Sequence, residues 1–221
     1  MPKQPQAAFE SVYAFAPNRD TLGGTAYLIV ENDADGAANI LVDCPPWHGE
    51  TEDFLARHGG VRWLVITQRR AIAHVQPLCD RFGARVILQE QEAYLLPNLP
   101  VESFAQERMI SPHTQVIWTP GHSPGSSCVY CQREGGILFS GRHLLPNPQG
   151  ELTLVKSVNT FHWPRQIRSA AALRDRFSPD TLRWICPGAN TGFLRGRHAL
   201  DRAHDRLAHL TVLSHPLPTL G

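Results

Sequence analysis

Short apolar runs alternate with segments of helical spacing along the whole chain. Two of these runs, Thr25–Val30 and Asn39–Asp43, lie on either side of a polar loop, a pattern that predicts a pair of adjacent strands. Further along, Gly59-Gly60 and Phe82-Gly83 mark the ends of two helices. The first of these helices is expected over 51–58. Strands are expected over 61–67 and 84–88, and a helical turn over 90–94. The first half is therefore predicted to have a β-α-β-α order.

The second half, from about Gln115, has the pattern of several strands followed by helices. Strands are expected within 116–123, 128–131, 135–141, 151–157 and, as the last one, 183–188. The segment Pro164–Phe177 begins with a proline, which is tolerated in the first turn of a helix. Its apolar positions have helical spacing and predict a face packed on a sheet: Ile167, Ala170, Ala171 and Leu173. A second amphipathic pattern predicts a closing helix over about 196–213.

Together these elements predict an α/β fold of two β-rich halves with helices outside, which is a four-layer αββα sandwich. The chain has 221 residues, and no repeat or low-complexity linker divides it. A chain of this length can bury a sizeable core without disulfides or metal ions. We therefore expect a single domain over 1–221, with its core at about 9–192.

Composition narrows the classes of function. Lys and Arg number 21 and Asp and Glu number 20, a net charge of +1 that argues against nucleic acid or an anionic membrane as the main partner. No apolar run approaches the roughly 18–20 residues that a membrane-spanning helix needs. The beginning of the chain lacks the order of a signal peptide, and five scattered cysteines suit a reducing compartment. Cys128 and Cys131 form a CxxC, but within a strand they would point to opposite faces. A cytoplasmic protein without membrane insertion is expected.

One segment carries a distinctive motif. Val116–Tyr130 reads VIWTPGHSPGSSCVY, a strand that ends in T-P-G-H and is followed by S-P-G-S and another strand. It resembles the metallo-β-lactamase superfamily. Four further segments resemble marks of that superfamily in the same order: LVD at 41–43, VITQRRAIAH at 65–74, LFSGRHL at 138–144 and ICPGANTG at 185–192. The resemblance covers about 23–192, which is most of the chain.

The resemblance implies an αββα fold with a metal cleft at one edge. Superfamily members usually bind two divalent ions, commonly zinc, which polarise a carbonyl or phosphoryl group and supply hydroxide. Their substrates include β-lactams, thioesters, nucleic acids and lactones, so the fold alone does not select one.

Most of the metal ligands that the superfamily places in these motifs are missing here. The motif T-H-x-H-x-D-H and its later partners fall on Gln68, Arg70, Ile72, Ala73, His122, Arg142 and Ala189. Only His122 keeps the ligand. A one-residue shift would add His74, which still leaves fewer than the three protein ligands typical of catalytic zinc. The sequence therefore predicts a degenerate branch of the superfamily with no bound cofactor.

Charge supports this prediction. Arg70 and Arg142 replace a metal-binding imidazole and a bridging carboxylate. A guanidinium about 5 Å from a divalent ion repels it by roughly 6–7 kcal/mol at an effective dielectric constant of about 20. Two readings of the arginines remain open. They neutralise Asp43 or Glu90, or Arg69, Arg70 and Arg142 form a pocket for phosphate or carboxylate.

Three hypotheses for function follow. The leading one is a metal-free protein that binds a partner protein or a small anion. The rival is an ester or thioester hydrolase with one zinc or other divalent ion on His74 and His122. The third is a subunit of a larger complex, with Phe161–Trp163 and Leu95–Pro100 as contact candidates. A serine hydrolase is not favoured, because Ser123, Ser126 and Ser127 beside His122 lack a G-x-S-x-G elbow, and His122 is then expected to hold its loop.

Overall fold

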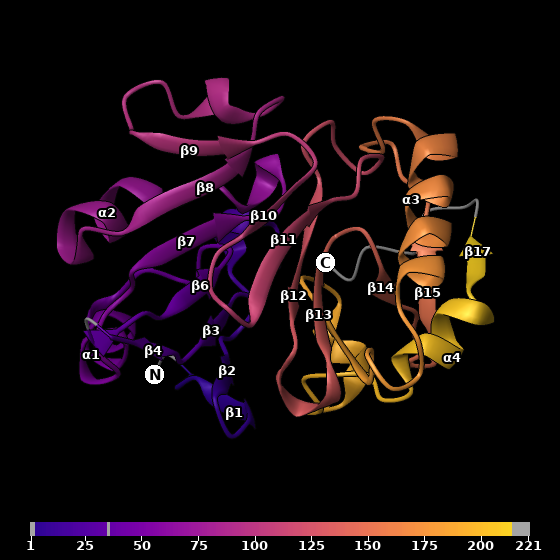
Figure 1. Cartoon of the computed structure of the whole chain (residues 1–221), viewed down its shortest axis with the longest axis horizontal. Helices are drawn as coiled ribbons and strands as arrows, with labels where there is room; N and C mark the ends of the chain where they lie inside the picture. The colour runs from indigo at the N-terminus through magenta and orange to yellow at the C-terminus, as the bar shows by residue number, and fades with distance from the viewer. Residues whose placement is uncertain (1–2, 35, 214–221) are drawn as a thin grey trace. The chain divides into compact units, whose positions relative to one another are not determined.

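The computed structural model describes residues 3–34 and 36–213, which belong to two compact units. One unit ends at Ala105 and the other begins at Gln106 (Figure 1). Each unit has its own β-sheet and its own helices, so the predicted α/β class is confirmed. The assignment of 1–221 to a single domain stays a prediction.

A seven-stranded mixed sheet forms the N-terminal unit. Its strands, in the order in which they lie, are β1 (Gln6–Phe9), β2 (Val12–Ala14), β3 (Tyr27–Ile29), β6 (Ile40–Val42), β7 (Trp63–Ile66), β8 (Arg85–Gln89) and β9 (Val101–Phe104). The predicted pairing of the first two apolar runs is confirmed, because β3 and β6 are antiparallel neighbours. The loop between them contains a small hairpin of β4 (Asn32–Asp33) and β5 (Gly36–Ala37). From β6 to β9 the strands are parallel.

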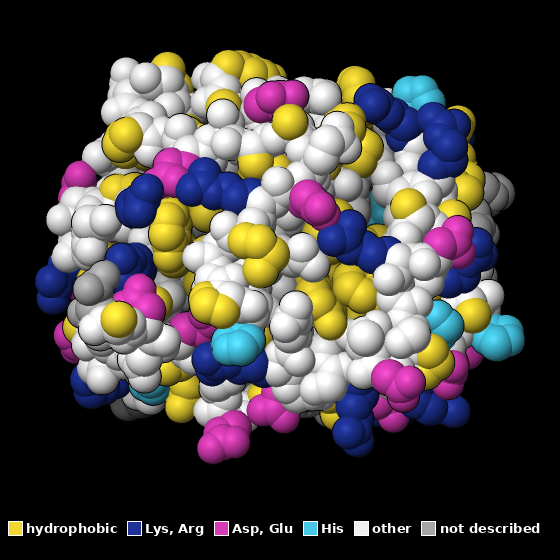
Figure 2. All heavy atoms as spheres, in the orientation of Figure 1, with side chains coloured by type: hydrophobic (Ala, Val, Ile, Leu, Met, Phe, Trp, Pro, Cys, Tyr) yellow, Lys and Arg dark blue, Asp and Glu magenta, His cyan; other side chains and the backbone are white. Residues whose placement is uncertain are grey.

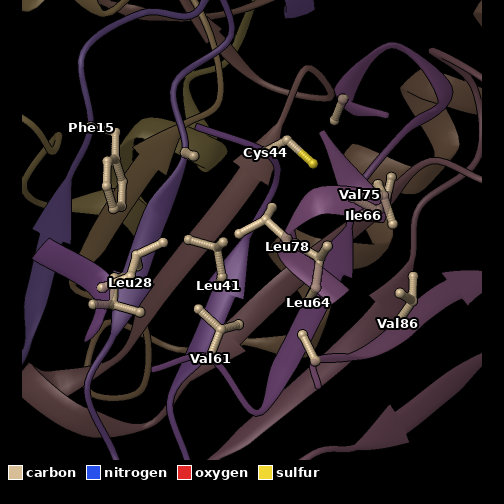
Figure 3. Packing of buried hydrophobic residues seen from close by; sticks show 14 of the residues in the cluster. Phe15, Leu28, Leu41, Cys44, Val61, Leu64, Ile66, Val75, Leu78 and Val86 are labelled. Atoms are coloured by element: carbon tan, nitrogen blue, oxygen red, sulfur yellow. The ribbon is translucent and has the colours of Figure 1, made fainter. Parts of the chain in front are cut away.

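Two helices connect the parallel strands. They are α1 (Gly49–Arg57) and α2 (Val75–Phe82), and shorter 3-10 turns lie at Arg19–Thr21, Arg69–Ala71 and Ala93–Leu95. The predicted end of α2 is confirmed, since Gly83 follows it with a left-handed φ of 65°. Figure 3 shows alternate strand residues, among them Leu28, Leu41 and Leu64, pointing to the same side as Val75 and Leu78 of α2. The helices are thus held on one face of the sheet by burial of apolar side chains.

The C-terminal unit has a five-stranded sheet and a smaller one. The larger sheet consists of β10 (Glu107–Met109), β11 (Thr114–Trp118), β12 (Ser127–Cys131), β13 (Ile137–Gly141) and β16 (Trp184–Pro187). The smaller sheet consists of β14 (Leu145–Pro146), β15 (Leu152–Val155) and β17 (Thr211–Leu213). Two helices, α3 (Trp163–Arg176) and α4 (Ala203–Ala208), and 3-10 turns at Arg133–Gly135 and Thr191–Leu194 complete the unit.

The start of α3 agrees with the sequence pattern, but its buried face is narrower than expected. The His162 side chain accepts a hydrogen bond from the backbone N–H of Arg165, and Pro164 lies in the first turn. Ala170 and Leu173 are buried against the sheet, among residues that include Tyr130. Ile167 was expected on this face but is 38% exposed.

The predicted closing helix over 196–213 is wrong in its extent, since α4 contains only Ala203–Ala208. Gly196 and Arg202 have left-handed φ values of 87° and 47°, which a continuous helix does not allow. Leu200 lies extended and forms a β-bridge with Ile185. The chain then continues into β17, which pairs in parallel with β15, so β16 is not the last strand. Across the described residues, the search for helices that could cross a membrane found none long and apolar enough.

A buried carboxylate joins two strand ends in the N-terminal unit. Asp43 follows β6 with a φ of 63° and is 6% exposed. Its carboxylate accepts hydrogen bonds of 2.7 Å from both the backbone N–H and the hydroxyl of Thr67, which follows β7. Since Thr67 begins the loop that carries Gln68 to His74, this Asp43–Thr67 clamp sets where that loop starts.

Replacing Asp43 with Ala is expected to lower the free energy of unfolding by about 3 kcal/mol, because it removes two hydrogen bonds to a buried charge. Asp43→Asn should cost less, since Asn tolerates the left-handed conformation and keeps one acceptor oxygen. Chemical denaturation monitored by circular dichroism measures both. An Ala variant within 0.5 kcal/mol of the natural protein, roughly the scatter of surface substitutions, would refute the clamp.

Candidate functional site

The loop between β7 and α2 carries four of the positions at which the resemblance places metal ligands. Gln68, the first of them, is 3% exposed, and its side-chain oxygen accepts a hydrogen bond of 2.8 Å from the backbone N–H of Arg70. The backbone carbonyl of Gln68 accepts a second hydrogen bond, from the N–H of Ala71. The Gln68 amide therefore caps the 3-10 turn that follows it.

The next positions in this loop are mostly apolar. Ile72 and Ala73 pack against the hydrophobic core of the N-terminal unit and offer no metal-binding atom in their side chains. Arg70 is partly buried. The apolar side chains of this loop thus contact the core of the N-terminal unit.

Arg69 has an acidic partner that the sequence analysis did not single out. Its Nε donates to Oε1 of Glu92 at 2.8 Å. The Glu92 side chain is fully buried, whereas that of Arg69 is 39% exposed. The second oxygen of Glu92, Oε2, is buried and has no hydrogen-bond partner among the described residues. Arg69 is thus the counter-ion of a buried carboxylate, and its place in an anion pocket stays a prediction.

His74, the candidate from the shifted alignment, also has a carboxylate partner. Its Nε2 lies 2.8 Å from Oδ2 of Asp20. The nearby thiol of Cys44 is fully buried, and burial raises its pKa to about 12 despite hydrogen bonds from the backbone of Ala73 and His74. Cys44 is therefore a neutral thiol and a poor metal ligand or nucleophile.

In the C-terminal unit, the T-P-G-H-S-P-G-S loop is closed by its own hydrogen bonds. The N–H of Thr119 donates to the carbonyl of Ser126 at 2.8 Å, and the N–H of Ser123 donates to the Ser126 hydroxyl at 2.8 Å. The Ser123 and Ser126 hydroxyls lie 3.1 Å apart and are buried. These serines hold the loop together, which agrees with the expectation that they are not nucleophiles.

Gly121 brings this loop into direct contact with α3. Its φ is 145°, and a Cβ there would lie 2.3 Å from Cα of Gln166, so only glycine fits. The carbonyls of Gly121 and His122 accept hydrogen bonds from the N–H groups of His162 and Phe161. These backbone bonds tie the loop to the residues before α3, while the role expected for the His122 side chain stays a prediction.

The segment after β13 places a histidine, rather than a carboxylate, in the interior. His143, next to Arg142, is 1% exposed, and neither ring nitrogen has a hydrogen-bond partner among the described residues. Gln166 donates from Nε2 to the His143 carbonyl at 3.0 Å, and its own Oε1 is likewise buried and unpartnered there. Burial, with a smaller contribution from His122, lowers the pKa of His143 to about 3. The imidazole is therefore neutral at physiological pH.

The last ligand position has no side chain that could bind a metal. Ala189 is 1% exposed and follows Gly188, whose N–H donates to the Gly141 carbonyl at 2.7 Å. A Cβ at Gly188 would lie 2.7 Å from Cα of Gly141. Because the backbones at the ends of β13 and β16 are in close contact, there is no space for a side chain at Gly188.

The family-model comparison matches residues 20–189 to the metallo-β-lactamase superfamily, which is most of the chain. The chain belongs to that superfamily. The motifs recognised in the sequence, from LVD to ICPGANTG, all lie within or overlap the matched range. No curated protein matches the sequence.

Solved structures confirm the metallo-β-lactamase fold. A β-lactamase domain protein from Burkholderia ambifaria matches at 16% identity and a TM-score of 0.65, over 95% of this chain and 76% of that one. TTHA1623 in a di-iron-bound form matches at 19% identity and a TM-score of 0.63, over 83% of this chain and 92% of that one. ETHE1 from Myxococcus xanthus matches at 17% identity and a TM-score of 0.62, over 83% of this chain and 76% of that one. At these identities the likeness concerns the fold alone.

The side chains of this superfamily member do not fit a pair of divalent ions. Imidazoles and carboxylates are the donors that such ions need, and most of the inherited positions have neither. Among residues 3–34 and 36–213, no group of three or more His, Cys, Asp or Glu side chains is placed to hold a metal ion. We therefore derive no catalytic step through a metal.

The Arg69–Glu92 pair gives a prediction about stability. Arg69→Ala is expected to lower the free energy of unfolding by about 2 kcal/mol, less than the 3–5 kcal/mol of a fully buried pair because Arg69 is partly exposed. Arg174→Ala is the matched control, since its pair with Asp175 is exposed on both sides and should cost no more than about 0.5 kcal/mol. Urea denaturation compares the two. Equal costs would show that Glu92 does not depend on Arg69.

His143 predicts a dependence of stability on pH. Its folded pKa of about 3 lies below the ordinary value of 6.5, so the unfolded state binds the proton first. Stability is fully present above about pH 6.5 and falls as the pH is lowered toward 3, by about 2 kcal/mol between pH 7 and pH 5. His143→Leu should remove most of this loss in denaturation experiments at several pH values. The exposed His113, replaced by Gln, is the control and should leave it unchanged.

Proposed function

We propose that this protein is a member of the metallo-β-lactamase superfamily that has lost metal-dependent hydrolysis and acts by binding. The observation that carries this proposal is what now occupies the ligand positions. Gln68 caps a turn, Ile72 and Ala73 pack against the core, and the Ala189 side chain has no atom that could bind a metal. His122 is the ligand position that keeps an imidazole.

Charge and ligand number support the proposal independently. Structural zinc sites with four ligands provide about 10–16 kcal/mol, and catalytic sites keep three protein ligands. A single imidazole provides only a fraction of this. Each arginine at a former ligand position adds a permanent positive charge, since a guanidinium does not lose its proton at physiological pH. In the C-terminal unit, His122 keeps the imidazole, but Arg142 stands where the resemblance places a bridging carboxylate, and this combination favours an anion over a cation.

Two kinds of ligand suit a binding protein of this composition. A small anion, phosphate or carboxylate, would use Arg70 in the N-terminal unit or Arg142 in the C-terminal unit, since Arg69 pairs with Glu92. A partner protein would use exposed apolar residues, and Phe161 is 55% exposed within the contact segment that the sequence indicated. The second contact candidate, Leu95–Pro100, follows Tyr94, which is 66% exposed.

The rival function is hydrolysis of an ester or thioester by one divalent ion on His74 and His122. One observation favours it: Nε2 of His74 lies against the carboxylate of Asp20. Carboxylates commonly orient metal-binding imidazoles in this way. The same contact is also made by histidines without a metal, so the rival needs metal binding to be measured.

The proposal predicts that restoring two ligands does not restore activity. A variant with Gln68→His and Arg142→Asp still has Arg70, Ile72 and Ala189 at ligand positions, so no zinc-dependent hydrolysis of ester, thioester or β-lactam substrates is expected. Elemental analysis of the natural protein, purified without chelator, should find zinc, iron and manganese well below one ion per chain.

His122→Ala is the control for this experiment. Under the proposal, metal content is low and is the same with and without the His122 imidazole. Stoichiometric metal that is lost in His122→Ala and in His74→Ala would establish the rival. Zinc-dependent turnover by the double variant would also overturn the proposal.

A further inference from the structure

One short stretch of the C-terminal unit has several large apolar side chains exposed. Val158 is 95% exposed, Phe161 is 55% exposed and Ile167 is 38% exposed. All three lie within ten residues, in the segment that leads from β15 into the first turns of α3. We call residues 156–168 the α3 entry surface. Isolated exposed apolar residues need no explanation, but three on one short segment do.

The conformation of this segment is fixed by hydrogen bonds. The N–H of Ser157 donates to the Thr160 hydroxyl at 2.9 Å, and the N–H of Thr160 donates back to the Ser157 carbonyl at 3.0 Å. Val158 lies at the tip of the turn that these bonds close. The N–H of Phe161 then donates to the His122 carbonyl at 3.1 Å. These hydrogen bonds fix the backbone in a conformation in which the Val158 and Phe161 side chains are exposed to solvent.

Positive charge accompanies these apolar side chains. Lys156 and Arg168 are exposed, and the Arg165 guanidinium lies 5.2 Å from the centre of the Trp118 ring. Between Leu152 and Arg174 the sequence contains no Asp or Glu. In Figure 2, dark-blue, cyan and yellow side chains gather over the upper end of α3, with no magenta among them. The rest of the face in view has both signs interspersed, as the net charge of +1 leads one to expect.

We propose that the α3 entry surface docks on a membrane that contains anionic lipids. Charge complementarity selects an anionic partner, and protruding apolar side chains select one that can accept them at its surface. A lipid interface supplies both, since acyl chains lie just below the phosphates. A lipid interface can also accept these side chains without a binding pocket on the protein. The cavity of about 360 Å³ on this unit is lined by other residues, among them Trp118, Ser169 and Arg176.

The attachment is peripheral and reversible. Each Lys or Arg near an anionic membrane contributes about 1 kcal/mol, and the contribution falls off within the screening length of the salt. A few cations with Val158 and Phe161 at the interface therefore give weak binding that salt weakens further. This inference does not rest on the loss of metal-dependent hydrolysis, because none of the former ligand positions lies in 156–168; it shares only Phe161 with the partner-binding surface considered above.

Cosedimentation of the full chain with lipid vesicles tests the proposal. The protein should sediment with vesicles of phosphatidylcholine and phosphatidylserine at low salt, and not with phosphatidylcholine alone or at high salt. Phe161→Glu should abolish binding. Arg168→Ala should weaken partitioning about fivefold, the loss that corresponds to one interfacial cation.

Matched variants control for exposure and charge. Tyr94→Glu places the same charge at an aromatic residue of similar exposure in the N-terminal unit, and Arg174→Ala removes an arginine from the far end of α3. Both should bind as the natural protein does. Absence of binding to phosphatidylserine vesicles at low salt overturns the proposal, and so does equal loss in the controls. Binding to poly-glutamate without binding to vesicles would overturn it in favour of an acidic protein.

Discussion

The two hydrogen bonds from Thr67 to the Asp43 carboxylate are the constraint on which the loop over 68–74 of the N-terminal unit depends. Two parallel strands, β6 and β7, end side by side, and a buried carboxylate fixes the first residue of the loop beyond them. A buried carboxylate is stable only when its lone pairs are satisfied, and Thr67 provides two donors. The loop that begins at Thr67 therefore has a fixed starting point.

The side chains of the loop after Thr67 make contacts within the protein. The Gln68 side-chain oxygen accepts a hydrogen bond from the backbone, and Ile72 and Ala73 pack against the core. Arg69 serves as the counter-ion of the buried Glu92. Each of these contacts stabilises the fold without a metal ion. Their combined effect is to fix the conformation of this loop through contacts within the N-terminal unit.

The C-terminal unit keeps its loop geometry by close packing. Gly121 lies against the backbone of Gln166, and Gly188 lies against Gly141, so the loops that follow β11 and β16 are held at fixed positions. The same packing buries His143 without hydrogen-bond partners and keeps it neutral. Behind this rigid arrangement, the residues that lead into α3 present apolar and cationic side chains outward. The interior and the surface of this unit thus serve different purposes, stability and contact.

The sequence by itself determined the superfamily, the pairing of β3 with β6, the C-terminal end of α2 and the absence of His, Asp or Glu side chains from most of the positions at which the resemblance places metal ligands. Apolar runs, glycine positions and motif letters are local signals, and local signals suffice for these features. Tertiary structure decided the rest. The spacing of Leu200, Ala203 and Leu207 fits a helix, yet Leu200 pairs with Ile185 in a β-bridge, and a long-range hydrogen bond leaves no trace in local periodicity. The partner of Arg69 and the burial of His143 likewise depend on residues distant in sequence, because charge and burial energies are set by neighbours in space.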